Sequence, residues 1–260
     1  MVFDPSKPSM ARAYDFLLGG KDNFAADREL AQQLLEIYPR TADLMRENRA
    51  FISRAVTYVA GRGVSQFLDV GAGMPTSPNT HEIARAVHPA ARVAYLDIDP
   101  VVISHTSALL ATHDGVAAMH GDARAPEAIA AHPELLKIID PGEPACVILA
   151  MVLHFVDAAT ARDIIAAFSR LLAPGSYVIV SVGRGKDEVG EQMTQTYSAA
   201  SLYNHSKEQI TSFFGDLALV PPGLAEARSW RAEWPRVHVP AHAGQVLVGI
   251  GHKPTVSNSS

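Results

Sequence analysis

The sequence has little of what marks a membrane, secreted or nucleic-acid-binding protein. Its 260 residues include one cysteine, Cys146, so no internal disulfide can form and the chain fits a reducing compartment. The longest strongly apolar run, 145–153, is far shorter than the roughly 20 residues that a membrane-spanning helix needs. A net charge of −5 gives no general attraction for nucleic acid or an acidic membrane.

The start of the chain also lacks the apolar segment of a secretory signal, because Asp4, Pro5 and Lys7 occupy that region. Hydrophobic residues make up 48% of the chain and charged residues 19%, which excludes a disordered or fibrous protein. We therefore expect a cytoplasmic protein with its own core. Cys146 lies in an apolar run, and we expect it to be a small buried side chain.

Residues 10–60 have the apolar pattern of helices. One stripe, 30–37, and a second, 44–59, follow the helical period, and Tyr38-Pro39 separates them. The stretch 17–24 is too rich in glycine for a helix interior, so it predicts a loop. We interpret residues 1–60 as a helical cap or lid on the α/β part of the chain that follows, the two forming one structural domain.

From Gly61 onward, short apolar runs alternate with helical patterns. Strands are predicted at 66–70, 93–96, 116–120, 145–150, 177–182, 217–220 and 245–250. Helices are predicted between them, from caps at Asn79 and Asp157, from Ser206 with Gln209, and over 100–112 and 126–139. This alternation predicts a doubly wound, mostly parallel, seven-stranded Rossmann-like sheet over 61–253, with a frayed tail at 254–260.

The strongest motif is the turn that follows the first strand, Asp69-Val70-Gly71-Ala72-Gly73. Glycine lets the backbone turn sharply and lets a ligand approach closely. Asp97 ends the second strand, 26 residues after Gly71, where a carboxylate can accept both ribose hydroxyls of a nucleoside cofactor. A dinucleotide site would carry a third glycine, but Thr76 stands there and Pro75 removes an N–H, so a ligand without a pyrophosphate fits better.

Two further segments follow later strands. Gly121-Asp122-Ala123 comes after the third strand, where a carboxylate can face an adenine amine, although a plain β-turn has the same composition. His154 comes after the fourth strand, near the expected reacting centre. It can orient a substrate or accept a proton, or it can be a structural histidine at a helix start.

These segments together resemble the class I S-adenosylmethionine-dependent methyltransferases. The resemblance narrows to one bacterial family, first catalogued as a domain of unknown function and then labelled S-adenosyl methyltransferase. It is carried by residues 11–24, which include Tyr-Asp-Phe-Leu-Leu-Gly-Gly, and by residues 47–51, 67–76 and 79–82. It covers nearly the whole chain and implies S-adenosylmethionine as the cofactor, but it does not imply a particular methyl acceptor.

By this resemblance, each part of the cofactor has its own set of residues. Asp69, Gly71, Ala72 and Gly73 border the methionine part, Asp97 and Ile98 the ribose, Gly121, Asp122 and Ala123 the adenine, and Ala150 and Met151 the floor beside the sulfonium. Methyl transfer then requires alignment and exclusion of water more than a catalytic triad. We expect His154 and Tyr14 to be the catalytic residues.

The N-terminal block 12–23 is polar around the pair Gly19-Gly20. We expect it to form a lid over the active site, with Lys21 or Arg12 near the methionine carboxylate, Asn23 also contacting cofactor, and Tyr14 against cofactor or acceptor. The alternative is a surface turn between packed helices.

Other functions remain open at this level. A nicotinamide-dependent oxidoreductase and a non-catalytic S-adenosylmethionine-binding module are the alternatives. We expect a small-molecule acceptor and no nucleic acid, membrane or metal. Of the histidines, His238 and His242 have helical spacing, but Pro240 lies between them. Trp230 and Trp234 wall a substrate pocket or, in the interpretation we favour, cover the edge of the sheet. The sequence contains no pattern that indicates an oligomeric state.

Overall fold

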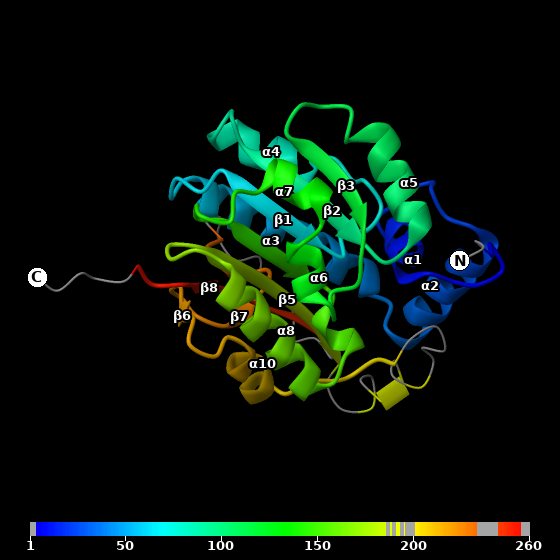
Figure 1. Ribbon diagram of the computed structural model, residues 1–260. Coiled ribbons are helices and arrows are strands. Elements are labelled where there is room, and N and C mark those ends of the chain that lie inside the picture. Colours follow the sequence, from blue (N-terminus) through cyan, green and yellow to red (C-terminus); the bar gives the residue numbers. More distant parts are fainter. Residues whose placement is uncertain are drawn as a thin grey trace, which may run out of the picture.

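The computed structural model describes residues 4–185, 201–232 and 244–255, together with residues 188, 191, 192 and 195. Helices cover both faces of one sheet (Figure 1). Trp234, His238 and His242 lie outside the described residues. None of the described helices is long and apolar enough to cross a membrane.

The sheet has the predicted doubly wound arrangement. The strands are β1 (Gln66–Val70), β2 (Arg92–Asp97), β3 (Val116–His120), β4 (Cys146–Ala150), β5 (Tyr177–Gly185), β6 (Ala218–Leu219), β7 (Ala225–Glu226) and β8 (Gly244–His252). Their order is β3-β2-β1-β4-β5-β8-β6, and β7 also pairs with β8. Strands β1 to β5 are parallel, and β8 is antiparallel to β5. The sequence predicted seven of these eight strands and missed the two-residue β7.

The helices also follow the sequence pattern, with one difference. They are α1 (Met10–Leu17), α2 (Ala25–Ile37), α3 (Thr41–Ala60), α4 (Thr80–Val87), α5 (Pro100–Leu109), α6 (Pro126–Ala130), α7 (Pro133–Ile138), the 3-10 helix η1 (Leu153–Phe155), α8 (Ala158–Leu171) and α10 (Lys207–Phe213). The single helix predicted over 126–139 is wrong. Pro133 starts a new helix there, and the side chain of His132 caps it.

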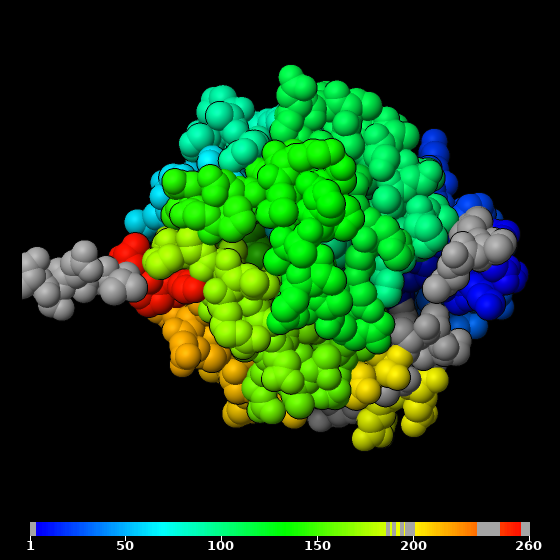
Figure 2. All heavy atoms as spheres, in the orientation of Figure 1, coloured from blue at the N-terminus to red at the C-terminus, as the bar shows by residue number. Residues whose placement is uncertain are grey.

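Alternating residues of each strand face two separate cores. Phe67 packs with α3, whereas Leu68 packs with α7 and α8 on the other face. The segments that cover the second face are the green atoms at the centre of Figure 2. Cys146 is fully buried, as expected, and burial raises the pKa of its thiol.

Trp230 is also fully buried, and its ring meets Phe51 edge to face with centroids 5.4 Å apart. It therefore packs in the core on the α3 face of the sheet and does not line either of the cavities found among the described residues. In the sheet order, β1 lies between β2 and β4, so the connections after these strands diverge at their carboxyl ends. Ligands of such folds bind in the crevice that this divergence opens.

Candidate active site

A cavity of about 390 Å³ lies at the carboxyl ends of the strands, within the size range of small-molecule sites. Most of the residues predicted from the sequence line it, and three, Arg12, Lys21 and Asn23, do not. Those present are Tyr14, Asp69, Gly71, Ala72, Gly73, Asp97, Ile98, Gly121, Asp122, Ala123, Ala150, Met151 and His154. Residues far apart in the sequence therefore meet around one space.

The glycine turn after β1 uses both glycines, for different reasons. Gly71 and Gly73 have φ angles of +72° and +67°, the left-handed region that other residues seldom adopt. A Cβ on Gly71 would lie 2.4 Å from Cγ2 of Val152, so this glycine is required by protein packing. A Cβ on Gly73 would meet no protein atom within 4 Å, and this residue lines the cavity. At Gly73 the backbone is therefore open to a ligand.

Asp97 is buried at the end of β2 and is held by backbone donors on both oxygens. The N–H of Gly73 donates to Oδ2 and the N–H of Asp99 donates to Oδ1, each at 2.9 Å. Burial raises the pKa of Asp97, and these hydrogen bonds oppose the rise. Because a carboxylate oxygen can accept more than one hydrogen bond, the fixed group retains the capacity to accept two ligand hydroxyls.

Asp69 and Arg49 occupy the neighbouring part of the wall. Burial raises the pKa of Asp69, while Thr80 Oγ1, which donates to it at 2.6 Å, and the charge of Arg49 oppose the rise. Arg49 Nη2 donates to the carbonyls of Thr76 at 2.9 Å and Pro78 at 2.7 Å. This clamps α3 to the loop after Gly73. Sequence reasoning missed Arg49 as a site residue.

After β3, Asp122 forms an ion pair with Arg124, and both residues line the cavity. The hydrogen bonds from Arg124 lower the pKa of Asp122. A Cβ on Gly121 would lie 2.7 Å from Cδ1 of Leu96, so a glycine is needed here for packing. The lowered pKa keeps the carboxylate of Asp122 ionised at neutral pH.

The two residues expected to be catalytic are both buried or half-buried in the wall. Burial, with a smaller contribution from His205, lowers the pKa of His154 to about 3, and its Nδ1 has no hydrogen-bond partner among the described residues. Tyr14 donates its hydroxyl to the carbonyl of Met45 at 3.0 Å, and burial raises its pKa to about 12. At neutral pH the imidazole is uncharged and the phenol keeps its proton.

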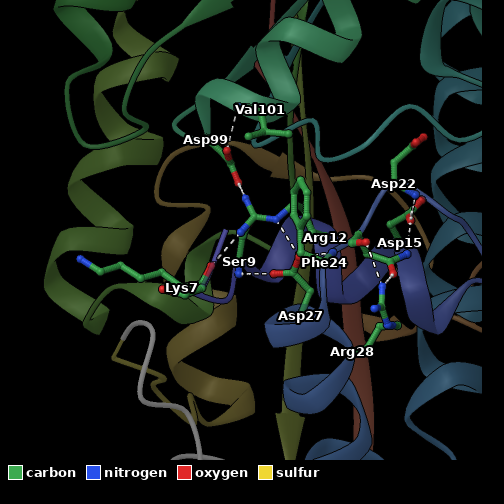
Figure 3. A network of polar contacts seen from close by, with 12 residues as sticks. Lys7, Ser9, Arg12, Asp15, Asp22, Phe24, Asp27, Arg28, Asp99 and Val101 are labelled. Atoms are coloured by element: carbon green, nitrogen blue, oxygen red, sulfur yellow. Dashed lines mark hydrogen bonds and ion pairs between the residues drawn. The ribbon is translucent and has the colours of Figure 1, made fainter. Parts of the chain in front are cut away.

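The loop at 18–24 has a different arrangement from the one expected, since Lys21 and Asn23 do not line the cavity. Instead, Asn23 Nδ2 and the N–H of Asp22 donate to Oδ2 of Asp15, at 2.9 and 3.0 Å (Figure 3). A Cβ on Gly20 would lie 1.9 Å from Oδ1 of Asp15, which explains this glycine. The loop holds Asp15, and Asp15 is the member of this group that faces the cavity.

Arg12 also has a partner other than the one expected. Its guanidinium binds Asp27 of α2 and Asp99 after β2, each at 2.8 Å, and is buried between them (Figure 3). The cavity wall near it is formed by Pro8, Ser9, Met10 and Ala11. The N-terminal segment thus contributes to the site through residues 8–15, and Arg12 anchors that segment.

The charge around the cavity suits a cationic ligand. Its wall carries five carboxylates, of Asp15, Asp69, Asp97, Asp99 and Asp122, and two guanidinium groups, of Arg49 and Arg124. Among the described residues, no cluster of three or more histidine, cysteine or acidic side chains is placed to hold a metal. S-adenosylmethionine, the cofactor that the sequence resemblance implies, carries a sulfonium and an ammonium against one carboxylate, so its net positive charge suits this wall. Gly73 also leaves the backbone open to a ligand.

Two proteins of known structure are similar to this chain in both sequence and fold. A Thermobifida fusca protein solved under the name of a methyltransferase is 38% identical with a TM-score of 0.90, and 96% of each chain is covered. A DUF574 family protein from Streptomyces avermitilis is 31% identical with a TM-score of 0.88, covering 96% of this chain and 99% of that one. A search of curated proteins finds no match.

The fold recurs at greater distance. The N-methyltransferase NodS from Bradyrhizobium japonicum, in complex with S-adenosylhomocysteine, is 14% identical with a TM-score of 0.51 over 88% of this chain and 98% of that one. The family model described as S-adenosyl methyltransferase matches residues 2–254. The chain belongs to this S-adenosyl methyltransferase family, an enzyme family whose cofactor is S-adenosylmethionine.

Proposed function

We propose that this methyltransferase acts on a small-molecule acceptor in the bacterial cytoplasm. The observation that carries the proposal is the single cavity that joins the glycine turn, Asp97 and Asp122 to the N-terminal helix α1. A volume of about 390 Å³ is in the range of small-molecule sites, and the cavity is lined by side chains from both parts of the chain. The net charge of −5 argues against a nucleic-acid substrate.

In this proposal the cofactor extends along the carboxyl ends of β1, β2 and β3. The methionine part lies at Asp69, Gly71, Ala72 and Gly73, with Arg49 as the basic residue beside it in place of Lys21 or Arg12. The ribose lies at Asp97 and Ile98, the adenine at Gly121, Asp122 and Ala123, and the sulfonium above Ala150 and Met151. Asn23 acts indirectly, through the carboxylate of Asp15.

The bound cofactor supplies an electrophilic methyl group on sulfur. The chain has to align a nucleophile with the methyl–sulfur bond and keep water away. His154 and Tyr14 serve this purpose as uncharged, fixed groups in the wall, since neither exchanges a proton near neutral pH. Residues 1–60 act as a cap that completes the site built on the α/β domain 61–253.

Calorimetric titration tests the proposal. The wild type should bind S-adenosylmethionine and S-adenosylhomocysteine at sub-millimolar concentration, and more tightly than NAD. Asp97→Ala should lose charge-assisted hydrogen bonds of roughly 1.5–3 kcal/mol, a fall in affinity of about 10-fold to 150-fold. Asp163→Ala, on the exposed face of α8, is the matched control. Unchanged affinity in folded Asp97→Ala places the ribose elsewhere.

A further inference from the structure

The side chain of Asn48, in the wall of the cavity, has a buried polar atom without a hydrogen-bond partner among the described residues, and its contacts show that this atom is the amide oxygen. Asn48 is 2% exposed, lines the cavity, and its Oδ1 has no hydrogen-bond partner among the described residues. Buried polar groups are almost always paired, and an exception calls for a ligand or a function. This amide is therefore a candidate contact for a bound molecule.

Tyr14 determines which way the amide points. The carbonyl of Met45 can only accept, so the proton of the Tyr14 hydroxyl is directed to it, at 3.0 Å. The Tyr14 oxygen must then accept from Asn48, 3.0 Å away, and only the NH₂ group of the amide can donate. Oδ1 is consequently the atom left over, and it is a hydrogen-bond acceptor that cannot become a donor by flipping.

Asn48 lines the same cavity as the segment after β4, the part that the proposed function assigns to methyl transfer. Ile52, one helical turn further along α3, also lines it, and α3 packs against α4 as well as β4, β5 and β8. The segment after β4 contributes Met151, His154 and Phe155. The ribose and adenine carboxylates follow β2 and β3, on the other side of β1 in the sheet. Apart from Oδ1 and the uncharged His154, this wall is mostly apolar.

Resting on the proposed function, we propose that Asn48 binds the methyl acceptor and that the acceptor presents an uncharged N–H or O–H group. An anionic acceptor would enter a cavity whose lining carries five carboxylates, and it would lie next to an oxygen that can only accept. An uncharged amine or hydroxyl gives its hydrogen to Oδ1 and keeps a lone pair for the methyl group. Asn48 is thus a residue that selects and orients the nucleophile.

The chemical step balances without a further reagent. The lone pair of the acceptor nitrogen or oxygen forms the bond to the methyl carbon, and the carbon–sulfur pair returns to sulfur, which leaves as the neutral thioether S-adenosylhomocysteine. The positive charge passes to the methylated atom. The hydrogen held by Oδ1 then leaves as a proton to water, because an amide oxygen is too weak a base to keep it.

The test uses the full chain saturated with S-adenosylhomocysteine and four aromatic probes, followed by ligand-observed NMR. Phenol and aniline carry the proposed donor, anisole lacks it, and benzoate is an anion. Phenol or aniline should bind at least about 10-fold more tightly than anisole and benzoate, the factor expected for one well-made hydrogen bond. Asn48→Leu should abolish this preference, and Tyr14→Phe, which frees the amide to flip, should reduce it.

The controls separate this proposal from the one on which it rests. Tyr58→Phe is the matched control for Tyr14→Phe, because Tyr58 lies on α3 and does not line the cavity. It should keep the preference for phenol and aniline over anisole and benzoate. Affinity of Asn48→Leu for S-adenosylhomocysteine should stay within about 3-fold of wild type; a loss of 10-fold or more in a folded variant would assign Asn48 to the cofactor amine. Equal binding of phenol, aniline and anisole, preference for benzoate, or no probe binding overturns the proposal. Failure of the wild type to bind S-adenosylhomocysteine overturns the proposed function itself.

Discussion

The guanidinium of Arg12 and the carboxylate of Asp99 lie 2.8 Å apart and join the N-terminal helices to the loop after β2 (Figure 3). The N–H of Asp99 donates in turn to Asp97, the proposed ribose ligand. On its other side Arg12 binds Asp27 of α2. One guanidinium therefore connects α1, α2 and the cofactor side of the sheet.

Replacing Arg12 by Met should destabilise the fold strongly. Asp27 is fully buried, so the variant leaves a carboxylate without its ion-pair partner, at a cost of about 3–5 kcal/mol. Urea denaturation measures the change in the free energy of unfolding. Arg46→Met, which removes an exposed pair with Asp43, should cost no more than about 1 kcal/mol. Equal effects of the two substitutions would rule out a structural role for the buried pair.

The two glycines of the turn after β1 should separate stability from binding. Gly71→Ala forces a Cβ against Val152 as well as a strained φ, so it should destabilise more than the roughly 1–2 kcal/mol of the left-handed region alone. Gly73→Ala should cost only that strain, because its Cβ points into open space. That Cβ should nevertheless lower S-adenosylmethionine affinity by about 10-fold or more. Wild-type affinity of Gly73→Ala by calorimetry would contradict the proposed cofactor position.

His154 should make stability fall on acidification. In the unfolded chain its pKa is near 6.5 and in the fold about 3, so unfolding takes up a proton between these values. Stability from this residue is complete above pH 6.5 and is lost as the pH falls, by about 1.4 kcal/mol for each pH unit. His154→Gln removes the effect, so the difference between variant and wild type in urea unfolding should narrow from pH 7 to pH 5. A constant difference would show that His154 is not a buried neutral imidazole.

Local sequence signals predicted the frame of the molecule well. Ser206 and Gln209 form the expected capping box, in which each side chain accepts from the other's backbone N–H at 3.1 and 2.7 Å. Such contacts span three residues, so the sequence alone contains them. The break at Pro133 was missed because Leu135 and Ile138 continue an apolar pattern across it.

The site was predictable where a motif carries its own geometry, as in the turn at Gly71 and Gly73. Arg49 and Asn48 were missed because they lie on an ordinary amphipathic helix, and only tertiary packing brings them to the cavity. Asn23 was assigned to the cofactor because the loop around it is polar, and polar loops often contact ligands. In the structure its side chain donates to Asp15 and holds that carboxylate in place. No pattern in the sequence distinguishes a contact with a ligand from a contact with a neighbouring loop.

The N-terminal segment should become protected when the cofactor binds. Met10, Ala11, Tyr14 and Asp15 line the cavity, and the loop that carries the exposed Lys21 is attached to Asp15. Trypsin must open this loop to cleave after Lys21. If opening removes the wall formed by α1, the open form cannot retain cofactor, and S-adenosylmethionine at about 100 times its Kd should slow cleavage by up to about 100-fold.

Arg62 provides the internal control for that experiment, since it lies in the exposed turn after α3 and does not line the cavity. Cleavage there should keep its rate when cofactor is added, which separates protection of the segment from general stabilisation. Tyr14→Ala should weaken the protection at Lys21, because it removes the contact of α1 with Met45 and Asn48. If cofactor leaves cleavage at Lys21 unchanged and Tyr14→Ala retains normal binding and turnover, the segment is a fixed turn between packed helices and has no closing function.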